Sequence, residues 1–339
     1  MNTLNTSSRP TDVFKLGGDT AGHPPFIVDL SNYFGNSNYE NRNTVIVCSA
    51  FGGVTKNIDA IFEIINTPEL SKEKMKKHIS SWLNQFKRTH ENIIKIFFYR
   101  SKKFKVVNAD FMSSYKELES FVDQALDGET RNTFLRNDDE RHSYLQACML
   151  KYGEICSTKI LSHYLDMSRF NFVYIDSRSF MKTNFKKKDD NSVKYDHNDV
   201  EIDFEETSRL IKQKFEGPFR EGKIVICSGF IAQDVNTGDD TTLGYDGSDY
   251  TGAVISSVLK AAHYSLFKAE EGLMSDDPKV DPGAYLINDA LYSETIDMCE
   301  KNGRWPIRRD ALELCRDSNT IMYLRPSSDV KSRGSRIHN

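Results

Sequence analysis

The sequence predicts an α/β protein, a three-layer α/β/α sandwich with a mainly parallel central sheet and two lobes. Two runs of mostly β-branched residues, 44–48 (TVIVC) and 223–227 (KIVIC), are typical of strands buried on both faces of a parallel sheet. Strand patterns alternate with helical patterns along the chain, the order found in layered α/β folds. Several strands end in polar turns with glycine, where open α/β sheets bind their ligands.

The apolar patterns specify the order of these elements. Short apolar or β-branched runs predict strands at 13–16, 44–48, 172–175, 223–227, 264–268 and 321–325. Apolar residues at helical spacing predict helices at 26–34, directly after 55, through most of 72–168, and at 205–216, 248–263, 293–302 and 308–315. Each strand except the last is therefore followed by a helical segment that can cover the sheet.

Proline, glycine and charge mark the limits of some elements. Pro24-Pro25 is expected to begin the first helix, and Gly217-Pro218 to end the helix at 205–216. Residues 186–199 are charged and rich in asparagine, which predicts a solvated loop or hairpin. One helical stripe is expected to be core rather than a cofactor site; it contains Trp82, Leu83, Phe86, Ile93, Ile94, Phe97 and Phe98.

Composition excludes several classes of protein. The 339 residues are 38% hydrophobic, enough for a sizeable core, and the net charge of −4 provides no general attraction to nucleic acid or anionic membranes. The six cysteines show no C-x-x-C spacing, which favours a reducing compartment over a disulfide scaffold. The first 11 residues lack a signal-peptide core, and no apolar run approaches the roughly 20 residues that span a bilayer. We expect a cytoplasmic protein that acts on small molecules.

Two glycine-containing loops have the composition of anion sites. Successive amides at Gly17 and Gly18 can form a nest beside the charge of Lys15, although an ordinary turn with a solvated lysine explains this loop better on local sequence alone. The segment 241–252 (TTLGYDGSDYTG) runs into a helix that Ser248 or Asp249 can cap. Free N–H groups at such a helix start favour an anion.

A third feature is the pair Gly153-Glu154, which we expect at the start of a helix. The carboxylate can simply favour the positive end of the helix dipole. It can equally be directed at a substrate ammonium group. Local sequence leaves both interpretations open.

Taken together, these loops resemble the motifs of aspartokinases, in the amino-acid kinase superfamily. KLGGDT at 15–20 is similar to KFGGTS, SAFGGVT at 49–55 to SAxGGVT, and Gly153-Glu154 to GE. The remaining matches are GFI at 229–231, TTLG at 241–244 and GSDY at 247–250 to GFI…TTLGRGGSDY, and GLMSDDPK at 272–279 to DGVYTADPR. The resemblance runs in one order from about residue 12 to 325.

This resemblance implies the amino-acid kinase fold and a division of the chain. Residues 12–220 would be the amino-acid-binding lobe and 221–325 the nucleotide-binding lobe, between a disordered tail at 1–11 and a basic, solvated tail at 326–339. The implied reaction transfers the γ-phosphoryl group of ATP to the side-chain carboxylate of aspartate, giving the acyl phosphate 4-phospho-aspartate. Mg²⁺ would be carried by ATP, with no protein ligand assigned to the metal.

The resemblance also implies roles for individual residues. Lys15 would neutralise the transferring phosphoryl oxygens, Asp249 would organise the cationic groups, and Arg304 stands where the family has a phosphate-binding lysine. These three form the implied catalytic set. Substrate-binding roles fall on Ser49, Thr55, Glu154, Tyr245, Asp246 and Ser248. Nucleotide- or phosphate-binding roles fall on Lys15, Gly17, Gly18, Gly229, Lys268, Gly272, Met274, Lys279 and Arg304.

The sequence departs from the family pattern at a position that binds the substrate. The family's RGGSD reads YDGSD at 245–249, and the missing arginine normally binds a substrate carboxylate. A charge-assisted contact contributes about 1.5–3 kcal/mol, so its loss should weaken aspartate binding about 10- to 150-fold unless another cation replaces it. Arg178 and Arg309 are the candidate replacements. The family's TDVD likewise reads KAEE at 268–271, and KVLHPR reads RWPIRR at 304–309.

Three hypotheses follow. The first is an aspartokinase that uses free aspartate, expected to be insensitive to feedback because the chain stops where the family's regulatory ACT domains would begin. The second is the same chemistry on a modified aspartate, whose α-carboxylate is masked as an amide, peptide or carrier-bound thioester. The third is a catalytically silent binding subunit of this fold. A homodimer through the catalytic lobes is one alternative for the assembly.

Overall fold

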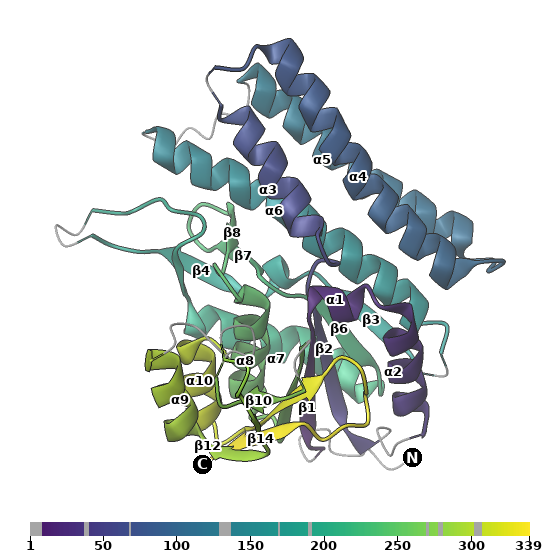
Figure 1. Cartoon of the computed structure of the whole chain (residues 1–339), viewed down its shortest axis with the longest axis vertical. Coiled ribbons are helices and arrows are strands. Elements are labelled where there is room, and N and C mark those ends of the chain that lie inside the picture. The colour runs from purple at the N-terminus through teal and green to yellow at the C-terminus, as the bar shows by residue number, and fades with distance from the viewer. Residues whose placement is uncertain are drawn as a thin grey trace.

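A mainly parallel sheet of eight strands forms the middle layer (Figure 1). The computed structural model describes residues 9–36, 41–67, 69–128, 137–168, 170–188, 192–268, 271–276, 281–301 and 307–339. The strands are β1 (Thr11–Leu16), β2 (Asn43–Cys48), β3 (Phe172–Ile175), β6 (Ile224–Ser228), β9 (His263–Lys268), β12 (Asp289–Leu291), β13 (Ile321–Pro326) and β14 (Ser335–His338). Their spatial order is β12-β14-β13-β9-β1-β2-β6-β3, and among them only β13 and β14 pair antiparallel.

Helices cover both faces of this sheet, which confirms the predicted three-layer fold. On one face a single core is shared by α1 (Gly18–Ala21), α2 (Pro24–Asn36), α3 (Val54–Ile65), α4 (Lys72–Phe98), α5 (Phe104–Asp127) and α6 (Asp138–Leu165). The other packs against α7 (Phe204–Arg220), α8 (Gly247–Leu259), α9 (Tyr292–Lys301) and α10 (Arg309–Asp317). In Figure 1, α4 and α5 form a long pair beyond α3 and α6.

The side chains of each strand alternate between two separate cores. On β2, Ile46 and Cys48 pack into the core shared with α2 to α6, whereas Val45 and Val47 pack into the core shared with α7 to α10. Successive strand residues point to opposite faces, so a strand covered on both faces must be apolar throughout. The continuous β-branched run in the sequence reflects this arrangement.

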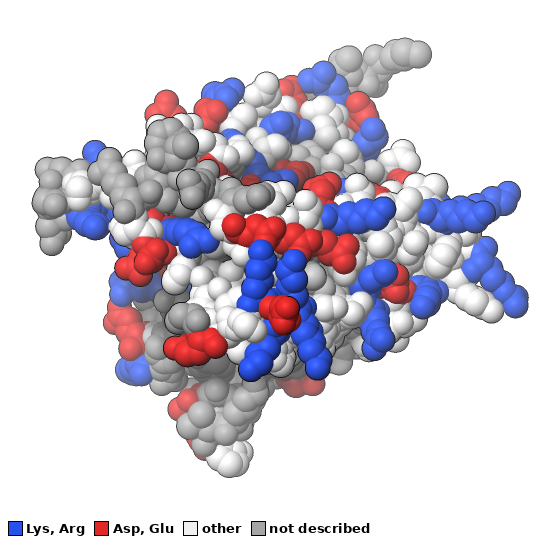
Figure 2. Space-filling model, turned by 90° about the horizontal axis from the view of Figure 1, so that it is seen from above, with Lys and Arg blue, Asp and Glu red and all other residues white. Residues whose placement is uncertain are grey.

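The predicted apolar stripe on α4 lies in the first core. Trp82 is partly buried and packs against this core, while the other six members are buried in it. On the surface, basic and acidic side chains are interspersed over the face seen in Figure 2. In the part of the chain that the structure describes, no helix is long and apolar enough to cross a membrane.

A second sheet of four strands was not predicted. It consists of β4 (Lys182–Phe185), β5 (Val200–Ile202), β7 (Ile231–Asp234) and β8 (Asp240–Thr242), in the order β5-β4-β7-β8. The charged segment between β4 and β5 contains an antiparallel bridge from Lys187 to Val193, in agreement with the predicted hairpin. A third pair joins β10 (Leu273–Met274) to β11 (Leu286–Ile287). These strands are too short for a periodic signal.

Gly217-Pro218 does not end α7, contrary to expectation. The helix continues to Arg220 with Pro218 in its last turn. A proline normally disfavours the helical conformation of the residue before it, because the proline ring clashes with the Cβ of that residue. Gly217 has no Cβ, so the helix can continue through Pro218. The buried rings of Phe215 and Phe219 on either side hold this turn against the sheet.

At both ends of the chain, the described residues include strand residues within the segments that were expected to be tails. Thr11 already belongs to β1, while residues 1–8 lie outside the described part. At the other end, β14 pairs with β12 and β13, and Ile337 is fully buried. Arg336 and His338 alternate with it and approach Asp289. Arg336 and His338 therefore occupy one face of a strand, whereas Lys331 and Arg333 lie before it and are exposed.

Replacing Gly252 by alanine should destabilise the fold. A Cβ at Gly252 would lie 2.3 Å from Tyr264 Oη, and Tyr264 is fully buried with its hydroxyl bonded to the Asp249 carbonyl at 2.8 Å. Overpacking of this kind costs about 1–3 kcal/mol of unfolding free energy, measurable by urea denaturation. Ser257→Ala on the same helix is the matched control and should change stability by less than about 0.5 kcal/mol. Equal stability of the two variants would contradict this packing.

Candidate functional site

The carboxyl ends of four neighbouring strands bring the predicted site together. In the sheet, β9, β1, β2 and β6 are consecutive and parallel, with Leu16 opposite both Cys48 and Phe267, and Cys48 opposite Ser228. The turns that follow these strands therefore meet at one edge, although Leu16 and Phe267 are 251 positions apart in the sequence. Such an edge is where α/β sheets bind ligands.

A buried carboxylate between two lysines forms the centre of this edge. Lys15 Nζ lies 2.7 Å from Asp249 Oδ1, and Lys268 Nζ lies 2.9 Å from Asp249 Oδ2. Asp249 is in the first turn of α8 and is fully buried. Burial alone would raise the pKa of Asp249, but the charges of Lys15 and Lys268 lower it well below its ordinary value. The carboxylate thus stays ionised and holds both ammonium groups at the strand ends.

Gly17 and Gly18 allow the turn after β1 to pass close to its neighbours. A Cβ at Gly18 would lie 2.6 Å from the Ala50 carbonyl oxygen, and a Cβ at Gly17 would lie 3.2 Å from that of Phe267. The first distance is too short for any side chain. The turn is therefore packed directly against the loop after β2 and the end of β9, with Lys15 immediately before it.

Glu154 lies in the middle of α6 rather than at a helix start, which corrects the sequence interpretation. Gly153 allows α6 to pack closely on α3, because a Cβ at this position would lie 3.0 Å from Val54 Cγ1. Burial raises the pKa of Glu154 to about 8, against the lowering effects of a hydrogen bond from the Ala50 N–H and the charge of Lys15. Its Oε2 atom is buried without a hydrogen-bond partner among the described residues. A carboxylate in this state is suited to a cationic ligand group.

The other predicted substrate residues surround this edge. Ser49 follows β2 and is half-buried, and Thr55 is exposed in the first turn of α3. Ser248 is buried at the start of α8. A Cβ added to Gly229 would lie 2.5 Å from the Cβ of Ser248. Gly229 thus permits the turn after β6 to contact α8.

The departure from the family motif produces a distinct local structure. Tyr245 is 68% exposed, and Asp246 adopts a left-handed backbone conformation with φ of 54°. Burial and the nearby carboxylate of Asp249 raise the pKa of Asp246, against the cations around it. This segment therefore adds a second acid beside Asp249 instead of the arginine.

The two arginines expected to replace the missing one are occupied elsewhere. Arg178 is bound by Asp176 and Asp240, and Arg309 is bound on the exposed surface by Glu300 of α9 and Glu313 of α10. Neither guanidinium is paired with the 245–246 segment in this structure.

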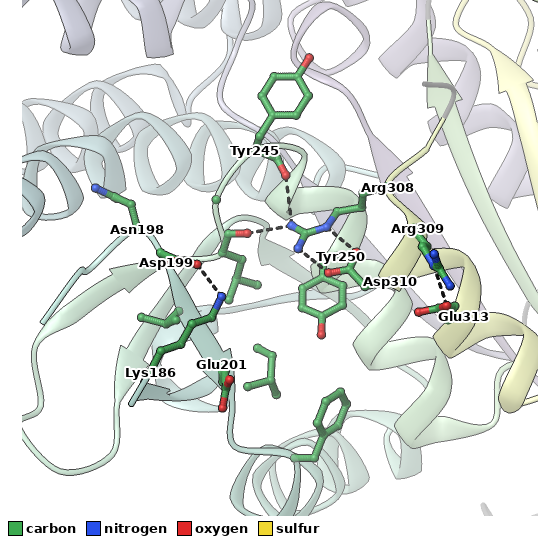
Figure 3. A pocket seen from close by; sticks show the side chains of 15 residues that line it. Lys186, Asn198, Asp199, Glu201, Tyr245, Tyr250, Arg308, Arg309, Asp310 and Glu313 are labelled. Atoms are coloured by element: carbon green, nitrogen blue, oxygen red, sulfur yellow. Dashed lines mark hydrogen bonds and ion pairs between the residues drawn. The ribbon is translucent and has the colours of Figure 1, made fainter. Parts of the chain in front are cut away.

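Sequence reasoning missed the arginine that does reach this segment. Arg308 Nη1 donates to the carbonyl oxygens of Leu243 at 2.8 Å and Tyr245 at 3.1 Å, while its other nitrogens bind Asp310 (Figure 3). Its guanidinium lies 4.4 Å from the centroid of the Tyr250 ring. Arg308 belongs to the run RWPIRR at 304–309, but the comparison with the family motif favoured Arg309, the residue after it.

A groove of about 980 Å³ lies beside this segment rather than over Lys15 and Asp249. Gly244, Tyr245, Tyr250 and Arg308 line one side of it, and residues from the β4–β5 hairpin line the other. In Figure 3 the Tyr245 ring points away from the groove while its carbonyl faces Arg308. We therefore place the candidate site at the buried carboxylate, where the charged groups converge.

The predicted nucleotide residues are only partly described. A Cβ at Gly272 would lie 2.5 Å from Ser335 Oγ, which also accepts from the Leu273 N–H at 2.8 Å, so β14 supports this loop. Met274 is half-buried on β10. Lys279 and Arg304 lie outside the described residues. Among the residues that are described, no group of three or more histidine, cysteine, aspartate or glutamate side chains is arranged to hold a metal.

Comparison with known proteins agrees with this geometry. The model of the Amino acid kinase family matches residues 11–325. Lysine-sensitive aspartokinase 3 of Escherichia coli is 26% identical over 191 residues, which cover 56% of this chain and 40% of that protein. Bifunctional aspartokinase/homoserine dehydrogenase 2 of Arabidopsis thaliana is 23% identical over 287 residues, which cover 84% of this chain and 28% of that protein. The chain thus spans less than half the length of these curated relatives, and the predicted resemblance to aspartokinases is confirmed.

A solved structure shows the same fold. Escherichia coli aspartokinase III in complex with aspartate and ADP aligns with a TM-score of 0.79 at 21% identity, covering 97% of this chain and 64% of that one. At 21% sequence identity, this structural similarity supports the fold alone.

The buried state of Glu154 predicts a specific pH dependence of stability. The native protein keeps this proton up to about pH 8, whereas an unfolded glutamate releases it near its ordinary value of 4.5. Between these values the native state binds more protons, so Glu154 lowers the unfolding free energy as pH rises, by up to about 1.4 kcal/mol per pH unit. Glu154→Gln should remove this slope, and its advantage over the wild type should grow from pH 5 to 8 in urea titrations. The exposed Glu69→Gln is the control; identical slopes for both variants would contradict the burial.

Proposed function

Because the chain belongs to the amino acid kinase family, we propose that it transfers the γ-phosphoryl group of ATP to the side-chain carboxylate of aspartate or an aspartate derivative. The observation that carries this proposal is the buried ion pair of Asp249 with Lys15 and Lys268, beside the ligand-suited carboxylate of Glu154. Two ammonium groups held at the carboxyl edge of the sheet are suited to phosphate oxygens. Glu154 is suited to the ammonium group of an amino acid.

In this proposal the protein positions and neutralises charge rather than abstracting a proton. The acceptor carboxylate is already ionised at neutral pH, so it needs no strong base. Lys15 and Lys268 would stabilise the charge that spreads over the transferring phosphoryl oxygens, and Asp249 keeps both lysines in place without movement during the reaction. Asp249 is occupied by lysines at both oxygens, which fits a Mg²⁺ ion that arrives on ATP and neutralises its phosphates.

Glu154 would couple substrate binding to a proton. Its pKa of about 8 means that much of this carboxyl is protonated at neutral pH in the empty site. A substrate ammonium group at Oε2 favours the ionised form and lowers this pKa. Binding of the amino acid would therefore release a proton at pH 7.

The identity of the acceptor depends on the 245–246 segment. Free aspartate carries an α-carboxylate, which Tyr245 and Asp246 do not neutralise and which Asp246 repels. Arg308 directs its donors to backbone carbonyls and to Asp310, which leaves it engaged in this structure. A masked α-carboxylate, as in an amide or peptide, needs no cation at this position. This favours an aspartate derivative over free aspartate.

Turnover with candidate acceptors tests the proposed function. Purified protein is assayed for ADP release with hydroxylamine present to trap an acyl phosphate, using aspartate and aspartic acid 1-amide as acceptors. Hydroxamate formation from either supports the kinase, and faster formation from the amide supports the masked substrate. No turnover with any aspartate derivative would favour a silent binding subunit, a reading that the intact pairing of Asp249 with both lysines disfavours.

Lys15→Ala should lower kcat about 100-fold or more with the better acceptor. The variant removes one of the two ammonium groups proposed to stabilise the transferring phosphoryl group, and loss of one such donor typically has this effect. Lys105→Ala, an exposed lysine on α5, should retain wild-type kcat. Steady-state ADP release measures both. Wild-type kcat in Lys15→Ala would exclude the assigned role.

Tyr245→Arg should shift specificity toward free aspartate. The new guanidinium can bind an α-carboxylate, which is expected to raise kcat/KM for aspartate about 10- to 150-fold while changing that for the 1-amide much less. Tyr245→Lys provides a cation without the paired donors of arginine and should give a smaller gain. If kcat/KM for both acceptors changes by the same factor, the position does not select the α-carboxylate.

A further inference from the structure

A buried chain of hydrogen bonds links α4 to the loop after β2. His90 on α4 is fully buried, with Nδ1 2.8 Å from the Phe86 carbonyl oxygen and Nε2 3.3 Å from Ser157 Oγ on α6. Ser157 Oγ in turn lies 2.9 Å from the backbone nitrogen of Phe51. Three segments distant in sequence are thus joined through two side chains.

Chemistry determines the direction of each hydrogen bond. Burial lowers the pKa of His90 to about 4, so the ring is neutral at physiological pH. The Phe86 carbonyl can only accept, which places the ring proton on Nδ1 and leaves Nε2 as an acceptor. The Ser157 hydroxyl must then donate to Nε2, and its oxygen accepts the Phe51 N–H. No alternative arrangement satisfies all four groups.

Aromatic packing holds the histidine ring in place. Its centroid lies 4.4 Å from that of Phe86, 5.1 Å from Phe111 and 5.4 Å from Phe51. The ring is therefore enclosed by apolar groups, and Nε2 has its hydrogen-bond contact with Ser157. An unpaired nitrogen in such surroundings is costly, so this contact is maintained.

The chain ends on the loop that carries the candidate substrate residues. Glu154 and Ser157 lie one turn apart on α6, and they accept the N–H groups of the successive residues Ala50 and Phe51. Ser49 precedes these amides and Thr55 follows them. Gly53 in between has φ of 80°, a left-handed conformation that favours glycine, directly before α3 begins at Val54.

We propose that His90 is a positioning residue for the amino-acid substrate. Through Ser157 it fixes the Phe51 amide, and so holds the loop 49–55 in register with Glu154. This inference rests on the proposed function for the identity of the ligand, but the hydrogen-bond relay itself does not. The relay should affect the affinity for the amino acid more than the affinity for ATP, because it ends at Phe51 in the substrate loop and meets the Gly17-Gly18 turn only through the packing of that loop.

Two variants break the relay at different points, and one control preserves it. Ser157→Ala removes the acceptor of the Phe51 N–H. His90→Phe keeps an aromatic ring in the cluster but removes the acceptor of the Ser157 hydroxyl. Phe111→Leu is the matched control, because it disturbs the same cluster without touching a hydrogen bond of the relay.

Amide hydrogen exchange and steady-state kinetics measure the outcome. In Ser157→Ala we expect exchange at Phe51 to become about 10-fold faster and KM for the amino-acid acceptor to rise about 10-fold, with kcat and KM for ATP within twofold of wild type. His90→Phe should change the same quantities in the same direction by a smaller factor. Phe111→Leu should lower Tm and change neither exchange at Phe51 nor KM. Nitrogen NMR of His90 should show a neutral ring protonated at Nδ1 from pH 5 to 8.

The outcomes separate this inference from the proposed function. Unchanged exchange at Phe51 in both relay variants, or a proton on Nε2 of His90, would overturn the relay whatever the enzyme does. Faster exchange with an unchanged KM for the acceptor would overturn the positioning role. If the wild type phosphorylates no acceptor, the proposed function fails, and exchange at Phe51 alone then decides whether the relay holds the loop.

Discussion

The ion pair of Asp249 with Lys15 and Lys268 is the interaction on which the rest of the site depends. A lone carboxylate at this depth would be strongly disfavoured, and only the two ammonium groups make its ionised form stable. The three residues come from α8, β1 and β9, so the electrostatic requirement joins the helix to both strands. The Tyr264 hydroxyl, bound to the Asp249 carbonyl, and the absence of a side chain at Gly252 allow α8 to approach this closely.

The same edge of the sheet contains carboxyl groups that are only partly stabilised by the protein around them. Glu154 has a buried oxygen without a partner in the part of the chain that the structure describes, and Asp246 has a raised pKa beside Asp249. Such groups lower stability unless a ligand completes them, and they occur most often at functional sites. In the proposed reaction, the substrate ammonium would satisfy Glu154. α6 provides this carboxylate and, one turn later, the serine of the proposed relay, so a single helix would set both the ligand contact and the loop around it.

Specificity is proposed to reside in the short segment before α8. The aspartokinase-like motif is retained at Gly247, Ser248 and Asp249, where the proposed phosphate chemistry would need it, and it departs at 245 and 246, where a substrate carboxylate would lie. Arg308 supports the backbone of the altered half from the groove side. In this proposal, chemistry and acceptor choice would depend on opposite ends of one turn and could change separately.

The sequence by itself determined the layered α/β fold, six of the eight strands of the main sheet and the order of the glycine loops. These features are local: a β-branched run of five residues or a stripe at helical spacing carries its own signal. It did not reveal β14, whose basic residues share one face of a short strand, or the continuation of α7 through Pro218, which depends on the packing of Phe215 and Phe219.

Only the tertiary structure decided which side chains meet. The sequence indicated Lys15, Asp249 and Lys268 separately, but their pairing depends on parallel strands that bring residues more than 200 positions apart to one edge. It misplaced Glu154 at a helix start, proposed Arg178 and Arg309 where Arg308 lies, and left His90 unnoticed. Each of these depends on burial and on contacts between distant segments, for which a periodic pattern contains no information.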